Sequence, residues 1–531
     1  MNVPGRAPAT PSSVRAFVRS RRARPAGLLD RYMTVFGVLM AAAVLGNPLS
    51  AALAGLAGRM EPARAAAGLA LVAVAWAAFV ALARVAGPVA LPAADAAWLV
   101  LSPLDRRGVL ARTARVLLAT AVVVGAVLGL AALAALGAPD ALVWRLVAAV
   151  VLGVSATAGT MALAVLGQAT PTWNGWLTAV TTALLLVAVL LGVAAMGGRA
   201  WSAFGPVTVV LTWPAALADA SPAWVAAVAG GAASAAALLV RRAWSALGHM
   251  PARAVLAAST RVGHVATATT TLDPSALTWA AEDNHWRTRR LRSRPWPSFP
   301  APFALAWHDW RRAARRPGRL VALPATAVLP TVLAQALGGT AGGAAPGLPP
   351  IVVASVLAGA VAVAVVHTAG SRRDGDNPAL SRLAGVGRRP ALAARALLPA
   401  LLGGAWAAAA LAGLMLVGAL PAGPTAGLGG AWWLFGPAMA PAVAAGALRM
   451  ARRGPVDHSM PVIDTPGGAI PTGPLFWALT GVDLAVLGCL PALAALAAGP
   501  DGIGGLLAAQ VVTGLAVLAG YVLRAGSSRR P

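Results

Sequence analysis

Apolar segments of about twenty residues recur along the whole chain and alternate with polar stretches rich in arginine. A helix of that length crosses the hydrocarbon layer of a bilayer. The pattern therefore predicts an all-α polytopic membrane protein with about 12 transmembrane helices. The expected spans are 33–58, 65–83, 116–137, 142–166, 176–196, 206–240, 320–337, 351–366, 397–420, 431–448, 475–498 and 503–523.

Two of these segments have particular features. The first, 33–58, is longer than a signal-peptide core and is followed by more spans, so we expect a retained anchor. The sixth, 206–240, is interrupted by Pro214, Asp219 and Pro222. It fits one broken span, a re-entrant pair of half-helices or two separate spans.

The polar stretch between the second and third spans occurs twice. Its copies read LSPLDRRGVLARTARVLL (101–118) and LSRLAGVGRRPALAARALL (380–398), and their Arg pairs, Arg106-Arg107 and Arg388-Arg389, lie 282 residues apart. We call the stretches 84–115 and 370–396 the first and second elbows. The duplication predicts two fused six-helix halves arranged as parallel repeats. The expected parts are a basic N-terminal arm (1–32), the first half (33–240), a linker (241–319), the second half (320–523) and a tail (524–531).

The arginines give this topology an orientation. With both termini inside, 38 of the 42 basic residues fall in inner segments, and all 42 are Arg because the chain has no Lys. Arginine resists translocation, so we expect a multi-pass protein of a bacterial inner membrane with both termini in the cytoplasm.

Composition agrees with this class. The chain is 59% hydrophobic and 11% charged. A water-soluble domain of this size could not bury so much apolar surface, whereas a membrane protein need not bury it. The net charge of +26 fits attraction to anionic membrane lipids, and we expect no nucleic-acid partner. The single cysteine, Cys489, excludes an intrachain disulfide.

An amphipathic segment precedes the second half. Phe303, Trp307 and Trp310 recur at helical spacing and are followed by Arg311 and Arg312. This pattern predicts an interfacial helix at the end of the linker, with its aromatic side toward the bilayer and its basic end at the phosphates.

Sequence chemistry gives no catalytic site. A phosphate-binding loop needs a Lys, and the 79-residue linker is too short for a nucleotide-binding domain, so the chain does not hydrolyse ATP by itself. The six His are scattered without metal-ligand spacing. We therefore expect no enzyme activity, no cofactor and no metal.

The elbows allow two interpretations. Each is far longer than a simple tether, with 32 and 27 residues, and each presents an Arg pair beside a membrane-entering helix. The pairs either anchor the topology or belong to short helices that dock in a partner and transmit its movement.

With a segment before each half and an elbow within it, the chain resembles ABC-type exporter permeases over roughly 12–240 and 300–523. The resemblance implies a permease subunit that depends on a separate ATPase present in two copies. It also implies that Asp105, Arg106, Arg107, Arg388 and Arg389 contact that ATPase. The second elbow lacks a counterpart of Pro103, so we expect weaker or asymmetric docking there.

Two alternatives remain. Major-facilitator carriers also have twelve spans, and LDRRG echoes their loop motif, but their loop is much shorter. An integral lipid- or glycan-modifying enzyme would need paired acids or His ligands at the membrane face, which the sequence lacks. The transported substrate is not readable from the sequence.

Asp483 is a candidate intramembrane site because it lies about eight residues into the eleventh expected span, where a charge costs roughly 2.5–3.5 kcal/mol. It is either a substrate or proton site or a packing residue. The text GPVDHSMPVIDTPGGAIPTG, within 449–473, resembles an uncharacterised bacterial multi-pass membrane family of unknown function.

Overall fold

The computed structural model describes most of the chain. The described residues are 62–137, 141–197, 220–270, 298–315, 317–337, 347–377, 385–420, 431–454, 456–457, 459–465, 468–500 and 502–525. The predicted N-terminal arm, the first span, residues 206–219 of the sixth segment, residues 378–384 of the second elbow and the end of the tail lie outside them.

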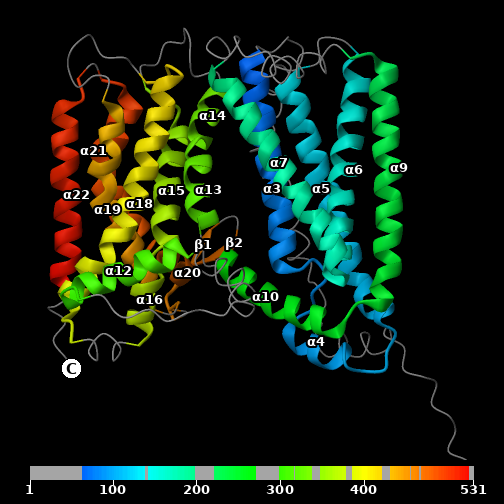
Figure 1. The fold of residues 1–531 in the computed structure, drawn as a ribbon, viewed down its shortest axis with the longest axis horizontal. Helices are drawn as coiled ribbons and strands as arrows, with labels where there is room; N and C mark the ends of the chain where they lie inside the picture. Colours follow the sequence, from blue (N-terminus) through cyan, green and yellow to red (C-terminus); the bar gives the residue numbers. More distant parts are fainter. Residues whose placement is uncertain are drawn as a thin grey trace, which may run out of the picture. The chain divides into compact units, whose positions relative to one another are not determined.

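The chain divides into two compact units, which we describe separately. In its described residues, the first unit contains eight helical elements, which appear in blue to green in Figure 1. They are α3 (Pro62–Ala86), α4 (Ala93–Leu99), α5 (Arg106–Leu136), α6 (Leu142–Ala169), α7 (Pro171–Gly197, whose end from Leu191 is grouped with the second unit), α9 (Pro222–Ala246), η1 (Leu247–His249) and α10 (Ala252–Thr270).

Helix α6 is the centre of the first unit, because it packs most extensively against α5 and α9 and also contacts α3. Glycines permit the close approach of α5 and α6. A Cβ on Gly153 would lie 2.8 Å from the Cα of Gly129, and one on Gly125 would lie 2.6 Å from the Gly153 carbonyl oxygen. The G-x-x-x-G pair of α5 therefore serves helix contact, as the small-residue rule predicts.

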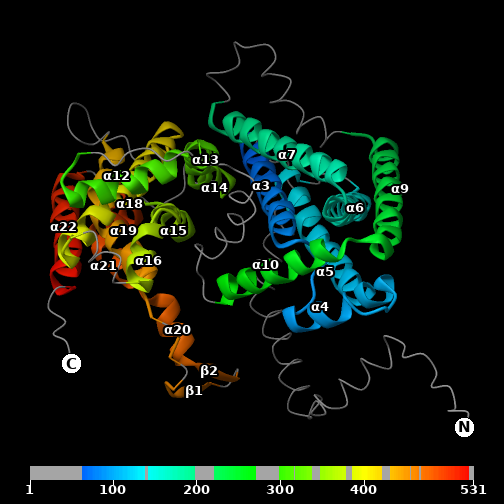
Figure 2. The same ribbon diagram turned by 60° about the horizontal axis from the view of Figure 1, so that its bottom comes forward.

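The second unit contains the remaining helices (Figures 1 and 2). They are α12 (Ala301–Ala314), α13 (Pro317–Ala327), α14 (Leu329–Ala336), α15 (Pro350–Val366), α16 (Ala369–Asp376), α18 (Arg388–Leu416), η3 (Trp432–Leu434), α19 (Phe435–Ala451), α20 (Thr472–Leu479), α21 (Val482–Ala498) and α22 (Gly504–Arg524). The strands β1 (Val462–Thr465) and β2 (Gly468–Pro471), which are grouped with the first unit up to Ile470, form a small two-stranded sheet.

Helix α19 has the central place in the second unit. It packs most extensively against α18, and also against α22, α21 and α15. Gly404 on α18 again allows the close approach, since a Cβ there would lie 2.7 Å from the Ala440 side chain. In chain order, α3, α5, α6 and α9 correspond to α15, α18, α19 and α22. The main contacts among the first four recur among the second four.

The fold is an all-α polytopic membrane fold. Among the described residues, eight helices are long and apolar enough to cross a membrane, or nine if the bent pair of α15 and α16 forms one span. The number twelve stays a prediction, because the first segment and part of the sixth are outside the described residues.

Three expected spans differ from the structure. The segment 320–337 is divided into α13 and α14, with Pro324 inside the first and Pro330 at the start of the second. The segment 475–498 is divided into α20 and α21, because Gly481 has φ +99°, which ends a right-handed helix. The expected sixth span is helical from Pro222, where Ser221 caps α9, and continues to Ala246.

The third and ninth spans begin earlier than hydropathy predicts. Helix α5 begins at Arg106 and α18 at Arg388, so each Arg pair is the first two residues of a long helix. Hydropathy misses these turns because they are polar. Between the second and third spans, each unit has a short helix, α4 in the first and α16 in the second.

Candidate functional site

The elbow residues of the first unit hold the start of α5. Asp105 caps this helix, because its Oδ1 accepts a hydrogen bond from the Arg107 amide at 3.2 Å and its Oδ2 one from the Gly108 amide at 2.8 Å. Arg106 donates from Nη1 to the Met250 carbonyl at 3.0 Å. The Arg107 guanidinium carbon lies 5.9 Å from the Trp244 ring centroid. Arg106 is half-buried, whereas Asp105 and Arg107 are exposed.

A neutral clamp anchors this elbow to the fourth span. Gln168, near the end of α6, accepts from the Val89 amide at 3.0 Å and donates to the Val89 carbonyl at 2.9 Å. The Leu91 amide donates to Ser259 Oγ of α10 at 3.0 Å. Val89 is fully buried among Leu110, Leu247, Met250 and other apolar residues. The elbow is thus bound to α6, η1 and α10, and the predicted linker begins as part of the first unit.

The other face of this elbow is apolar and exposed. Trp98 on α4 is 81% exposed, Leu101 is 68% exposed, and Pro103 is exposed beside them. Together with Asp105 and Arg107 they form a surface that we call the α4 face. An exposed aromatic residue on a short helix and an exposed aliphatic residue just after it, next to charged groups, have the composition of a protein–protein contact.

The second elbow has no equivalent cap. Gly387 is the N-cap of α18 and makes no side-chain hydrogen bond to it. Arg388 and Arg389 are both exposed, but they point to different surroundings: Arg388 lines a cavity described below and Arg389 does not. The short helix of this elbow, α16, presents charged residues such as Arg373 and Asp376, and it carries no large apolar side chain.

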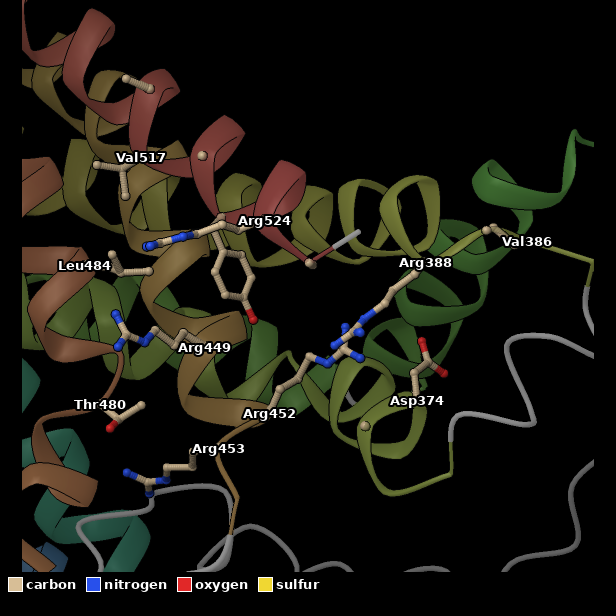
Figure 3. Close-up of a pocket in the computed structure, with 16 residues that line it drawn as sticks. Asp374, Val386, Arg388, Arg449, Arg452, Arg453, Thr480, Leu484, Val517 and Arg524 are labelled. Atoms are coloured by element: carbon tan, nitrogen blue, oxygen red, sulfur yellow. The ribbon is translucent and has the colours of Figure 1, made fainter. Parts of the chain in front are cut away.

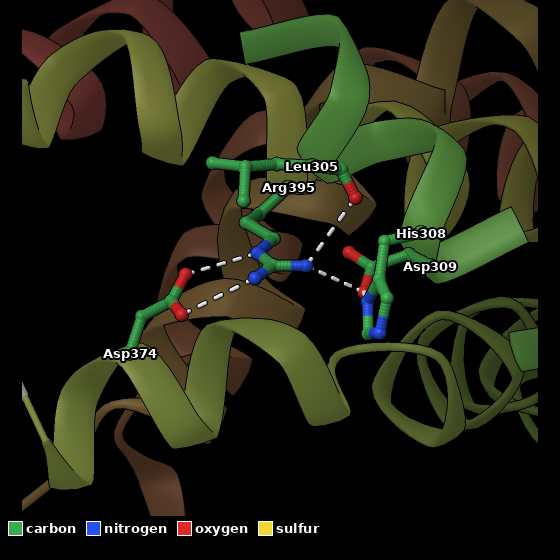
Figure 4. A network of polar contacts seen from close by, with 5 residues as sticks. All are labelled: Leu305, His308, Asp309, Asp374 and Arg395. Atoms are coloured by element: carbon green, nitrogen blue, oxygen red, sulfur yellow. Dashed lines mark hydrogen bonds and ion pairs between the residues drawn. The ribbon is translucent and has the colours of Figure 1, made fainter. Parts of the chain in front are cut away.

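A charged clamp anchors the second elbow to the ninth span (Figure 4). Arg395 on α18 donates to both oxygens of Asp374 on α16, from Nε at 2.9 Å and from Nη2 at 3.2 Å. Its Nη1 donates to Asp309 Oδ1 of α12 at 2.6 Å and to the Leu305 carbonyl at 3.4 Å. Arg395 is 7% and Asp309 5% exposed, so the ion pair is buried. One guanidinium therefore fastens both α12 and α16 to α18.

Gly370 makes room for this clamp. A Cβ at this position would collide with Arg395 Nη1 and Asp309 Oδ1. His308 Nδ1 lies 3.7 Å from the same Asp309 oxygen.

Helix α12 has the amphipathic arrangement expected of an interfacial helix. Its Ala304, Leu305 and Asp309 are buried, and Leu305 packs against Val386, Ala391 and Ala394. Phe303, Trp307 and Trp310 are exposed on other faces, and Arg311 and Arg312 are half-buried at its end. Phe299 and Trp307 make an edge-to-face contact at 6.0 Å between centroids. Helix α12 lies across the ends of the long helices of its unit (Figure 1).

An arginine-lined cavity of about 1040 Å³ opens at this same end of the second unit, where α18 begins and α19 and α22 end (Figure 3). Its guanidinium groups belong to Arg388, Arg449, Arg452, Arg453 and Arg524. Asp374, Thr480 and Tyr521 also line it. Arg388 and Arg452 point toward each other across it (Figure 3). We call this space the arginine cavity.

The pKa of Arg452 is lowered overall. Burial is the main cause, the phenol of Tyr521 opposes it, the neighbouring Arg388 adds to it and Asp374 opposes it. Arg453 lies with its guanidinium carbon 3.3 Å from the Trp477 ring centroid and donates to the Trp477 carbonyl at 3.2 Å. Clustered guanidinium groups at a half-buried position favour an anionic neighbour.

Asp483 lies beside this cavity, in the first turn of α21, directly after the break at Gly481. Its Oδ1 accepts from the amides of Gly481 and Leu484, each at 2.8 Å, and its Oδ2 lies 2.7 Å from Arg449 Nη1. The side chain is 40% exposed. Asp483 therefore forms an ion pair at a helix end, and its role as a substrate or proton site stays a prediction.

The first unit contains a cavity of opposite character. It measures about 640 Å³ and is bounded by α3, α5, α6, α7 and α9. Its lining is almost wholly aliphatic, apart from groups such as Arg145 and the hydroxyls of Thr157 and Thr160. Trp76 Nε1 donates to Thr160 Oγ1 at 3.3 Å in its wall. Within the described ranges of both units, no group of three or more His, Cys, Asp or Glu could hold a metal ion.

The family model described as "Family of unknown function (DUF6297)" matches residues 60–461, which is more than half of the chain. This agrees with the resemblance to a membrane family of unknown function, and no model of the ABC-type permeases matches. No curated protein matches the sequence.

Proposed function

The chain belongs to the DUF6297 family, and we propose that it is the membrane-spanning permease subunit of an ATP-driven exporter whose ATPase is a separate polypeptide. The observation that carries the proposal is the repeated elbow. In each unit a short helix separates the second and third spans, and the third span begins at an Arg pair.

The clamps support a mechanical role for the elbows. A helix that receives a push from a partner must be connected to the spans, or the push is absorbed by local movement. Gln168 ties the first elbow to α6, and Arg395 ties the second elbow and α12 to α18. Movement of either elbow is therefore transmitted to the central helix pair of its unit. ATP-driven closure of two partner subunits would rock each bundle, in the orientation with both elbows in the cytoplasm.

The α4 face supplies the docking surface that this mechanism needs. Trp98 and Leu101 would enter a groove on the ATPase, and Asp105 and Arg107 would form the polar rim. Arg106 donates a hydrogen bond to the Met250 carbonyl, and Arg388 lines the arginine cavity, so neither side chain is assigned to docking. Arg107 and Arg389 are then the members of the two pairs that remain for docking.

The test is the purification of the full chain from its native membrane, followed by photolabelling with an azido-ATP probe. We expect a separate labelled polypeptide that accompanies the chain and hydrolyses MgATP. The double variant Arg107→Glu/Arg389→Glu should lose this polypeptide while inserting normally. Arg112→Glu is the matched control, since Arg112 is also an exposed residue of α5. Absence of any labelled companion, or its full retention by the double variant, would refute the proposal.

The carrier alternative rests on the twelve expected spans and on the LDRRG text, with Asp483 as the candidate proton or substrate site. Asp483 is partly exposed and paired with Arg449 at a helix end. If the carrier interpretation were nevertheless right, vesicles without ATP would transport under an ion gradient, and Asp483→Asn would impair this transport.

A further inference from the structure

The arginine cavity is not needed for ATPase docking, and its composition indicates a ligand of its own. Positive charge at this end of a membrane protein is ordinary, because arginines remain on the inner side during insertion. That rule places arginines in loops and helix ends, where they can extend separately into water. It does not explain why five of them, from α18, α19, the residues after α19 and α22, line a single cavity.

The described lining of the cavity is strongly cationic. It contains five guanidinium groups and one carboxylate, Asp374, which accepts from Nε and Nη2 of Arg395. Burial and the nearby Arg388 lower the pKa of Arg452. An anion in the cavity would offset both effects.

Part of the remaining wall of the cavity is aliphatic. Leu484 of α21 and Ala516, Val517 and Gly520 of α22 continue the lining from the cationic end along the helices. A guanidinium fork matches phosphate oxygens in a bidentate manner. The aliphatic wall beside it matches the first methylenes of a lipid chain. The size of about 1040 Å³ admits a phosphate with its glycerol and the beginning of the chains.

We propose that the arginine cavity binds a phosphate-bearing anion, with the aliphatic wall favouring the headgroup of an anionic phospholipid. Arg388 and Arg452 are the principal ligands, because one begins α18, the other directly follows α19, and both point toward the same space (Figure 3). Binding would join the start of α18 to the end of α19, the most extensively packed helix pair of the unit.

The test uses the full chain in nanodiscs and contains no ATPase, so its result is independent of the proposed function. One arm measures retention of phosphatidylglycerol over phosphatidylcholine by native mass spectrometry. The other measures binding of inorganic phosphate to the chain in neutral detergent. We expect selective retention of the anionic lipid. The variant Arg388→Gln/Arg452→Gln should weaken it by roughly tenfold or more, since each loses a charged hydrogen bond.

Two controls separate binding from folding. Arg389→Gln removes the same charge from the neighbouring position, which does not line the cavity, and should leave binding unchanged. Arg388→Lys/Arg452→Lys keeps the charge and should retain part of the affinity. Phosphate binding without lipid selectivity would assign the site to a soluble anion of the same chemistry. If neither probe binds, or if the double Gln variant binds as the wild type does, the proposal is wrong.

Discussion

The two elbows perform the same structural task with different chemistry. Gln168 holds the first elbow through two neutral hydrogen bonds to one backbone position, Val89. Arg395 holds the second through three charged hydrogen bonds to two carboxylates, Asp374 and Asp309. A neutral amide leaves no charge behind when it is removed, whereas a buried guanidinium leaves unpaired carboxylates. The second half should therefore be much more sensitive to loss of its clamp.

The charged clamp gives the largest expected effect. Arg395→Met should destabilise the protein by about 3–5 kcal/mol, because Asp309 would remain buried without its cation. Equilibrium unfolding in detergent measures this loss. The double variant Arg395→Met/Asp309→Leu should recover part of it, since the buried charge is then absent. A loss for Arg395→Met below about 1 kcal/mol would mean that the clamp carries no stability.

Removal of the neutral clamp should cost less. Gln168→Leu leaves the buried amide and carbonyl of Val89 without this partner, at an expected cost of about 1–3 kcal/mol. Hydrogen exchange at the Val89 amide reports the same change locally and should accelerate. Gln168→Glu should give an intermediate result, because its carboxylate still accepts from the Val89 amide but cannot donate to the Val89 carbonyl. Unchanged exchange in Gln168→Leu would contradict the clamp.

A third substitution tests the geometry of the charged clamp without removing any of its groups. Gly370→Ala places a methyl group against Arg395 Nη1 and Asp309 Oδ1, and should cost about 1 kcal/mol or slightly more. Gly375→Ala on the same helix is the matched control, because its nearest neighbour, Arg452 Cγ, would lie at an ordinary 3.6 Å. Melting temperatures in one detergent compare the two. Equal temperatures would show that the clamp tolerates displacement.

Hydropathy predicted the positions of most long helices, because the bilayer requires a continuous apolar stretch of fixed length. It missed the first turns of α5 and α18, which are polar, and the breaks at Val328 and at Gly481. Pro324 and Pro330 signalled the first break. The positive φ of Gly481 has no clear sequence signature among the chain's many glycines.

The clamps could not be predicted from the sequence. Gln168 and Val89 are 79 residues apart, and Arg395 and Asp309 are 86 apart, so only the packing of the helices brings them together. In the sequence, Arg395 cannot be distinguished from the other arginines that fix the orientation of the chain in the membrane. Arg452 was likewise counted as a topological charge, and its position in the arginine cavity depends on the end of α19 meeting α16, α18 and α22.

The smallest effect on stability should come from a substitution in the α4 face. This substitution also tests whether the two elbows differ in how they bind the partner. Trp98→Ala should change the free energy of unfolding by less than about 0.5 kcal/mol, because the side chain is 81% exposed. The same variant should release the azido-ATP-labelled companion. Trp176→Ala on α7 is the control, an exposed tryptophan outside the elbow.

Asp376→Ala on α16 should release less of the companion than Trp98→Ala does, since α16 offers no apolar anchor. Equal losses from the two elbows would mean that docking is symmetric and that charge, not the exposed aromatic, holds the partner.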